Sequence, residues 1–282
     1  MAKQAITTTT IDGRFVAAAD ARISVFDNSL LYAEGLFETL LVVDDRIVFL
    51  DEHLDRLENR AEMIGLDLPM STGLLRTWMN KIVKAHPGHI RKLRLTITAG
   101  ESARWTGRQG KSRVILSVAR HCLPERPFRL LVASFHVDQD SVFRRVKTIS
   151  YALNAASFRQ AMQQKYDDAL LINERNQIAE VTSANFFWIE KGRIFTPPLS
   201  SGCLEGVTRR VLVREASKIG VTVKEKNCPL DRLRTADEVF ISSSLKLVVG
   251  VSEIRHGKNV FRFPAGDTSR LVSDYFCRLA GV

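Results

Sequence analysis

The apolar run Leu36 to Val43 limits the fold of this 282-residue chain more than any other segment. Its length and composition predict a buried strand, and Asp44-Asp45-Arg46 then predicts a turn into a second strand, Ile47 to Leu50. From Asp51 onward the apolar residues recur at helical spacing, and a second stretch with this spacing covers Leu74 to Ala85. A hairpin followed by two helices indicates a mixed α+β unit.

Further strands are predicted at Leu93 to Thr98 and at Val114 to Val118. Two prolines within His121 to Pro127 then bracket charged residues and interrupt the apolar pattern, so we expect a linker there. The predicted organisation is a small α/β domain at residues 1–120, a linker at 121–127 and a larger domain at 128–282.

The composition argues against several classes of protein. No apolar run approaches the roughly 20 residues that a membrane-spanning helix needs. The N-terminal residues lack the apolar stretch of a secretory signal, so we expect a cytoplasmic protein that does not act at a membrane. The four cysteines form no C-x-x-C pair and the six histidines form no cluster. We therefore expect neither a disulfide framework nor a metal site.

The net charge of +10 raises the question of nucleic-acid binding. The densest basic stretch runs from Arg91 to Arg113, but within it residues 91–98 alternate polar and apolar side chains, as a half-buried strand does. Aromatic residues that could stack on bases do not interleave with these basic residues. We therefore expect the positive charge to attract small anionic substrates rather than nucleic acid.

Three segments hold the candidate functional residues, in the order Val146 to Asn154, Glu180 to Asn185 and Gly202 to Arg209. The first carries the amine of Lys147, which can condense with an aldehyde. The carboxylate of Glu180 can pair with a pyridine nitrogen, and the glycine-bearing helix start of the third segment can bind a phosphate. These are the groups that pyridoxal 5′-phosphate (PLP) requires of a protein, and it is their ordered combination that is informative.

With these residues the chain resembles the class IV aminotransferases, which are fold-type IV PLP enzymes. That family includes D-amino-acid transaminases, branched-chain transaminases and aminodeoxychorismate lyases. The resemblance extends from about Phe26 to Val251. It implies an α+β fold, with a small N-terminal α/β domain and a larger C-terminal domain that has a β-barrel-like core.

The resemblance also implies roles for individual residues. Lys147 would form an imine with the cofactor aldehyde and would then move the proton between substrate and cofactor. Glu180 would keep the pyridine nitrogen protonated. The other implied cofactor-binding residues are Leu204 against the ring, Tyr151 near the ring hydroxyl, and Arg56, Val207, Thr208 and Ser244 at the phosphate.

Each of these residues also has an ordinary structural explanation. Taken alone, Lys147 is a solvated cation after a strand, and Glu180 is a glutamate at a strand end. Arg56 could be a helix arginine paired with Glu52 or Glu58.

The residues that the resemblance implies for substrate binding are Phe37, Thr39, Arg104 and Leu245. D-amino-acid transaminases bind the substrate carboxylate with an arginine and a histidine two residues apart. Arg104 matches the arginine, but Thr106 stands in place of the histidine. Arg104 therefore indicates a carboxylate substrate without identifying it.

The preferred interpretation is a PLP-dependent transaminase, at least a homodimer, that exchanges amino groups between an amino acid and a 2-oxo acid. The first alternative is an aminodeoxychorismate lyase, which eliminates pyruvate and leaves 4-aminobenzoate. Spacing alone does not separate the two. A more distant alternative is a non-catalytic protein that binds an anion or nucleic acid.

Overall fold

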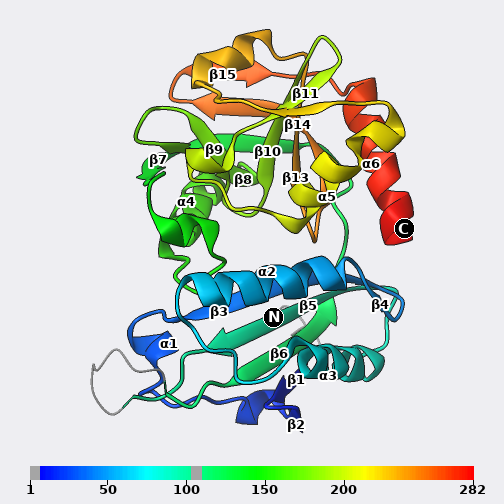
Figure 1. The fold of residues 1–282 in the computed structure, drawn as a ribbon. Helices are drawn as coiled ribbons and strands as arrows, with labels where there is room; N and C mark the ends of the chain where they lie inside the picture. Colours follow the sequence, from blue (N-terminus) through cyan, green and yellow to red (C-terminus); the bar gives the residue numbers. More distant parts are fainter. Residues whose placement is uncertain (1–6, 103–109) are drawn as a thin grey trace. The chain divides into compact units, whose positions relative to one another are not determined.

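The computed structural model describes residues 7–102 and 110–282 of the chain. These residues form two compact units, shown in Figure 1. The first comprises Met1–Cys122 and Val146–Ser150, and the second comprises Leu123–Arg145 and Tyr151–Val282. Each unit has its own sheet and its own hydrophobic core.

The first unit is built on a six-stranded sheet in the order β2-β1-β6-β5-β3-β4. All neighbouring strands in it are antiparallel. The strands are β1 (Thr7–Ile11), β2 (Arg14–Val16), β3 (Gly35–Val43), β4 (Arg46–Ile47), β5 (Ile90–Thr98) and β6 (Val114–Arg120). The helices are α1 (Asn28–Leu31), α2 (Leu50–Met63) and α3 (Thr72–Lys84), with a short 3₁₀ helix, η1 (Ala18–Asp20).

The predicted buried strand is β3, and the predicted hairpin is confirmed by the antiparallel pairing of Val43 with Arg46. The second strand of the hairpin is shorter than predicted. Phe49 takes a left-handed backbone conformation with φ of 54°, and the helix α2 begins directly after it at Leu50. The chain therefore leaves the sheet before Leu50.

One face of the first sheet packs against α2 and α3. Side chains of a strand alternate between the two faces, so Leu36 and Leu40 of β3 enter this core together with Met79 of α3. Burying a side chain of this size contributes roughly 1.5–3 kcal/mol. By the same alternation, Phe37 and Thr39 face the opposite side of the sheet.

The second unit contains a nine-stranded mixed sheet, in which β12-β11-β10-β13-β14-β7-β8-β9 follow one another and β15 pairs with β14. Three of the pairs are parallel: β11 with β12, β14 with β7, and β7 with β8. The strands are β7 (Phe128–Val137), β8 (Asp168–Asn173), β9 (Ile178–Val181), β10 (Asn185–Glu190), β11 (Arg193–Thr196), β12 (Val223–Glu225), β13 (Glu238–Ser243), β14 (Leu247–His256) and β15 (Asn259–Arg262).

The sheet of the second unit curls on itself, as Figure 1 shows, and encloses a core that includes Leu130, Phe186, Trp188 and Ile254. The helices are α4 (Ala152–Gln163), α5 (Val207–Glu215) and α6 (Asp267–Ala280), with 3₁₀ helices η2 (Val142–Arg145), η3 (Leu199–Ser201), η4 (Ala216–Ile219) and η5 (Leu230–Thr235). The predicted α+β fold with a barrel-like core in the larger part is thereby confirmed.

The segment Val146–Ser150 belongs to the first unit, although the ranges predicted from the sequence place it in the domain 128–282. Its backbone pairs with the beginning of β3, where Leu36 forms a bridge with Thr148. This pairing joins residues that are more than a hundred positions apart, which local sequence patterns do not reveal. The boundaries 1–120, 121–127 and 128–282 themselves stay a prediction.

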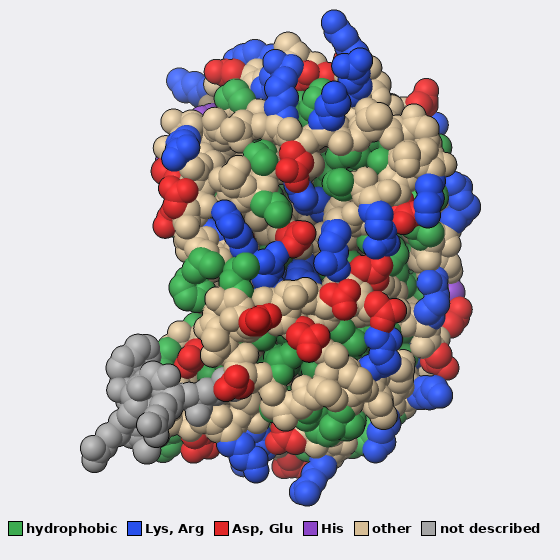
Figure 2. Space-filling model, in the orientation of Figure 1, with side chains coloured by type: hydrophobic (Ala, Val, Ile, Leu, Met, Phe, Trp, Pro, Cys, Tyr) green, Lys and Arg blue, Asp and Glu red, His purple; other side chains and the backbone are tan. Residues whose placement is uncertain are grey.

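Basic and acidic side chains are interspersed on the face of the molecule drawn in Figure 2, over both units. Within the part of the chain that the structure describes, no helix combines the length and the apolar character needed to cross a membrane.

Candidate active site

Lys147 is held against the edge of the first sheet by backbone hydrogen bonds. The Phe37 N–H donates to the Lys147 carbonyl oxygen at 2.9 Å, and the Ile149 N–H donates to the Gly35 carbonyl oxygen at 3.0 Å. A Cβ on Gly35 would lie 2.5 Å from the Ile97 carbonyl oxygen, so only glycine fits this close approach. The backbone that carries Lys147 is therefore fixed in position.

The side chain of Lys147 lies on the face of β3 that is turned away from α2 and α3. Its Nζ is 4.3 Å from the centroid of the Phe37 ring. The Arg94 guanidinium carbon lies 3.9 Å from the same centroid. Arg94 stands opposite Thr39 in the register of β3 and β5, and its Nε donates to the Thr96 hydroxyl at 3.3 Å. Phe37 is thus in contact with two cations.

The sequence does not single out Arg94, which belongs to a basic strand face expected to be solvated. The signal that could have revealed it is the cross-strand register. Because β3 and β5 are antiparallel neighbours, the pairing of Phe37 with Thr96 places Arg94 opposite Thr39, beside two residues that the resemblance does indicate.

Arg56 forms a buried network with Glu38 and His53 in the first unit. Its Nε donates to Glu38 Oε1 at 2.8 Å and its Nη2 donates to Glu38 Oε2 at 2.5 Å. His53 Nδ1 lies 2.6 Å from the same Oε2. The two-pronged partner of Arg56 is therefore Glu38 of β3, whereas the sequence suggested the helix neighbours Glu52 and Glu58.

The network has strong electrostatic consequences, because all three side chains are buried. Burial alone would raise the pKa of Glu38, but the charges and hydrogen bonds of Arg56 and His53 lower that pKa to about 2. Burial, together with the charges of Arg56 and Lys147, lowers the pKa of His53 in spite of Glu38. Glu38 is therefore an anion, and His53 favours its neutral form.

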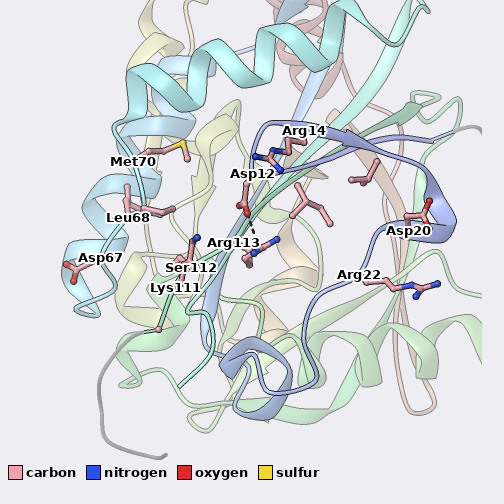
Figure 3. Close-up of a pocket in the computed structure, with 14 residues that line it drawn as sticks. Asp12, Arg14, Asp20, Arg22, Asp67, Leu68, Met70, Lys111, Ser112 and Arg113 are labelled. Atoms are coloured by element: carbon pink, nitrogen blue, oxygen red, sulfur yellow. Dashed lines mark ion pairs between the residues drawn. The ribbon is translucent and has the colours of Figure 1, made fainter. Parts of the chain in front are cut away.

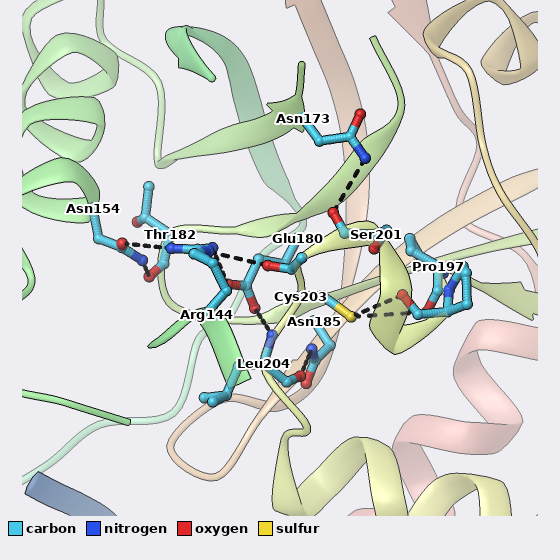
Figure 4. Close-up of polar contacts among 12 residues, drawn as sticks. Arg144, Asn154, Asn173, Glu180, Thr182, Asn185, Pro197, Ser201, Cys203 and Leu204 are labelled. Carbon is cyan, nitrogen blue, oxygen red and sulfur yellow. Dashed lines mark hydrogen bonds and ion pairs between the residues drawn. The ribbon is translucent and has the colours of Figure 1, made fainter. Parts of the chain in front are cut away.

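Glu180 lies near the end of β9 in the second unit, and both of its carboxylate oxygens accept hydrogen bonds (Figure 4). Arg144 Nη2 donates to Oε1 at 2.6 Å, and the Leu204 N–H donates to Oε2 at 3.0 Å. The side chain is buried, with an exposed residue fraction of 7%. Sequence patterns selected Glu180 and Leu204 but missed Arg144, which belongs to the 3₁₀ helix η2.

The helix α5 begins after Gly206 and supplies the predicted phosphate-binding residues Val207 and Thr208. Among the described residues no side chain caps this end of the helix, so its first N–H groups lack the usual capping bond there. The Thr208 hydroxyl is buried and has no hydrogen-bond partner among the described residues. A Cβ on Gly206 would lie 2.0 Å from Asn185 Oδ1, so a larger residue there would displace the buried Asn185 side chain.

The remaining predicted residues lie in loops. Ser244 and Leu245 form part of the turn between β13 and β14. Tyr151 immediately precedes α4. Arg104 lies outside the described residues.

A cavity of about 830 Å³ opens on the first unit, lined by the β1–β2 hairpin, residues 67–70 and residues 110–113 (Figure 3). Asp12 and Arg113 form an ion pair in its wall, with 3.0 Å between Oδ2 and Nε. None of the described site residues lines this cavity. Its size therefore gives no reason to assign it to the chemistry of Lys147 or Glu180.

The chain is similar to aminotransferases and to an aminodeoxychorismate lyase. The family model described as "Amino-transferase class IV" matches residues 35–254. A putative branched-chain-amino-acid aminotransferase of Methanocaldococcus jannaschii is 28% identical over 271 residues, which cover 94% of either chain. An aminodeoxychorismate lyase of Bacillus subtilis is 29% identical over 254 residues, covering 86% of this chain and 85% of the relative.

A solved structure shows the same fold. The branched-chain aminotransferase of the thermophilic archaeon Thermoproteus uzoniensis, solved with norvaline, is similar with a TM-score of 0.90 and 24% identity. The match covers 97% of this chain and 95% of that one. Because the family model spans most of the chain, from β3 to β14, this protein belongs to the class IV aminotransferase family.

Proposed function

We propose that the protein is a PLP-dependent transaminase that exchanges amino groups between an amino acid and a 2-oxo acid. The observation that carries the proposal is the start of α5, where a buried Thr208 hydroxyl without a partner among the described residues adjoins uncapped N–H groups. A buried donor without a partner costs about 1–3 kcal/mol, and a phosphate would remove that cost. The residues present therefore fit the phosphate of PLP.

The other proposed roles rest on the family and on the residue types. Lys147 would hold the cofactor through its amine and would move the proton at the substrate Cα. Glu180 would pair with the pyridine nitrogen. PLP, when bound, draws electrons from the substrate Cα and so makes that proton removable.

Further residues complete the proposed site. The cofactor-binding residues carried forward from the sequence are Arg56, Tyr151, Leu204, Val207 and Ser244, and the substrate-binding residues are Phe37, Thr39, Arg104 and Leu245. The guanidinium of Arg94, over Phe37 and opposite Thr39, supports a carboxylate substrate, since arginine binds carboxylates through two parallel hydrogen bonds.

We also propose a homodimer. Around α1, the side chains of Val25, Phe26, Leu30 and Leu31 are exposed although they are large and apolar. Monomeric proteins rarely expose large contiguous apolar patches, so a second copy of the chain is the proposed cover. Sedimentation velocity tests this, because a single species at the mass of one chain would contradict it.

All four cysteines are free thiols, which agrees with the proposed cytoplasmic location.

Absorbance spectroscopy tests the proposed reaction. The purified protein is mixed with PLP, and D-alanine, L-glutamate, L-leucine and D-glutamate are then added separately. A transaminase turns yellow with PLP, and its colour changes to that of the pyridoxamine form with at least one donor. The configuration of that donor shows whether the enzyme uses D- or L-amino acids. A protein that stays colourless and takes up no cofactor would instead support a non-catalytic binding protein.

The aminodeoxychorismate lyase is the second candidate, favoured by the 29% identity to the Bacillus subtilis enzyme of that name. A yellow protein that no donor converts, but that releases pyruvate from aminodeoxychorismate, would establish it. The residues assigned to the cofactor would keep their roles in either reaction.

A further inference from the structure

Arg144 connects Glu180 to two other parts of the second unit. Its Nη2 donates to Glu180 Oε1 at 2.6 Å, while its Nε donates to the Gly202 carbonyl oxygen at 3.0 Å. Its Nη1 lies 3.4 Å from Asn154 Oδ1, at the first turn of α4. A single guanidinium therefore contacts β9, the loop before α5 and the start of α4.

The groups that hold Arg144 are themselves fixed. Asn154 is buried, and its Nδ2 donates to the Thr182 carbonyl oxygen at 2.8 Å. Gly202 has φ of 86°, and a Cβ there would lie 2.9 Å from Gln139 Cα. Figure 4 shows Arg144, Glu180 and Asn154 directed toward one another. The orientation of the guanidinium is thus set by the packing around it and not by Glu180 alone.

Glu180 depends on Arg144 in both geometry and charge. Arginine stays protonated at any physiological pH, and its hydrogen bond to a carboxylate is about twice as strong as one between neutral groups. Arg144 and the Leu204 N–H donate to different oxygens of the Glu180 carboxylate. Two donors on different oxygens restrain the carboxylate to one rotamer.

We propose that Arg144 is a positioning residue for the reaction, because it holds the Glu180 carboxylate as an anion in the one orientation that can pair with the pyridine nitrogen. This inference rests on the proposed function. Arg144 does not touch the reacting atoms and acts only through Glu180. Lysine is a poor substitute, because one ammonium group does not reproduce the planar fork that serves Gly202, Asn154 and Glu180 together.

A double-mutant cycle tests the proposal with the variants Arg144→Gln, Glu180→Gln and the double variant, each loaded with PLP. Two quantities are measured: kcat for the best donor, and the absorbance of the bound cofactor as a function of pH. Arg145→Gln is the matched control, since Arg145 belongs to the same 3₁₀ helix but is exposed. Thermal unfolding of the cofactor-free proteins verifies that each variant folds.

The expected result is non-additive. Loss of a residue that orients a metal ligand costs about 10- to 100-fold, and we expect a similar effect on Glu180, so Arg144→Gln should lower kcat by at least about tenfold with little change in KM. The Arg144→Gln substitution should shift the pH at which the absorbance of bound PLP changes, in the same direction as Glu180→Gln does. In the Glu180→Gln background the same change should cost less than about twofold, because Arg144 no longer has a carboxylate to hold. Arg144→Lys should recover only a small part of the loss.

Two outcomes would overturn the inference, and they differ in whether the proposed function also fails. If Arg144→Gln lowers kcat by the same factor in both backgrounds and leaves the pH titration unchanged, Arg144 merely ties the loops together. In that case the proposed function stands. If the wild-type protein takes up no PLP, the proposed function fails first, and the role of Arg144 fails with it.

Discussion

Lys147 and Phe37 make two contacts with each other, a backbone hydrogen bond and a cation–π contact. The Phe37 N–H donates to the Lys147 carbonyl oxygen at 2.9 Å, and the Lys147 Nζ lies 4.3 Å from the centroid of the Phe37 ring. The first contact fixes the backbone and the second restrains the side chain that we assign to the reaction. A short segment from the second half of the chain thereby pairs with the start of β3, at the edge of the first sheet.

Phe37→Leu should destabilise the cofactor-free protein by about 1–2 kcal/mol, because the smaller side chain packs less well and the cation–π contacts with Lys147 and Arg94 are lost. Urea denaturation measures this free energy of unfolding. Phe15→Leu is the matched control, since that exposed ring also lies near a lysine, with Lys81 Nζ at 5.7 Å. Equal effects of the two substitutions would show that the contacts of Phe37 with Lys147 and Arg94 contribute nothing to stability.

The network of Glu38, His53 and Arg56 should make the protein sensitive to acid. The pKa of Glu38 is lowered from 4.5 to about 2, so its stabilising contribution is complete above the unfolded value of 4.5 and is lost as the pH falls toward 2. The pKa of His53 is lowered from 6.5, so below pH 6.5 the unfolded protein binds a proton at His53 more readily than the folded protein does. This difference also lowers the free energy of unfolding as the pH falls.

Glu38→Gln should therefore lower the free energy of unfolding at pH 7 by about 3–5 kcal/mol, because Arg56 loses its buried counter-charge. Between pH 7 and pH 3 the free energy of unfolding, measured by denaturation at each pH, should also decrease less for this variant than for the wild type. Asp44→Asn is the control, since the pair of Asp44 and His89 is exposed and should matter by less than about 1 kcal/mol. A parallel pH dependence of wild type and Glu38→Gln would contradict the argument.

Local patterns in the sequence predict the elements of the fold but not the pairings between them. The strand β3 is recognisable because its residues form an apolar run bounded by Asp44-Asp45-Arg46. By contrast, β1 consists of four threonines and an isoleucine, and it is a strand because it pairs with β2 and β6. Propensity alone is a weak signal there, since strand formation depends on the neighbouring strands.

The candidate site divides in the same way. Lys147, Glu180 and Thr208 can be found because each stands in a segment whose residue types suit one part of PLP. Arg144 and Glu38 are missed because their partners lie 36 and 18 positions away. Helix and strand periodicities relate only residues that are close in sequence. Contacts of this kind depend on tertiary register, which a single sequence does not display.

The buried and exposed cysteines should differ in reactivity. Burial, with a smaller contribution from Glu180, raises the pKa of the Cys203 thiol to about 11, whereas Cys122 is exposed. Since the thiolate is the reactive form, iodoacetamide at about pH 8 should label Cys122 and leave Cys203 unmodified in the native protein. Peptide mass spectrometry after a timed reaction gives the answer. Rapid labelling of Cys203 would mean that the region beside Glu180 is open to solvent.

Lys147→Ala should abolish turnover while the protein still binds PLP weakly through its phosphate contacts, because no other group supplies the amine. Activity with the best donor and retention of PLP on gel filtration are the two measurements. Lys84→Ala, at the end of α3, should behave as the wild type. Full activity in the Lys147→Ala variant would eliminate the assignment of this lysine.

Thr208→Val should stabilise the cofactor-free protein but weaken its binding of PLP. Without PLP, the substitution removes a buried hydroxyl that has no partner among the described residues, so the free energy of unfolding should rise by about 1 kcal/mol. With PLP, the substitution removes a hydrogen bond to a charged phosphate, which is worth about 1.5–3 kcal/mol, so the affinity for PLP should fall by about tenfold or more.

Thr196→Val separates this effect from a general response to losing a hydroxyl. The Thr196 hydroxyl is also buried, but it donates to the Phe186 carbonyl oxygen at 2.9 Å, so its removal should destabilise the protein by about 1 kcal/mol and leave the affinity for PLP unchanged. Thermal unfolding of the cofactor-free variants and fluorescence titration with PLP measure the two quantities. If Thr208→Val destabilises the cofactor-free protein as Thr196→Val does, the hydroxyl already has a partner, and the start of α5 loses its strongest support as the phosphate site.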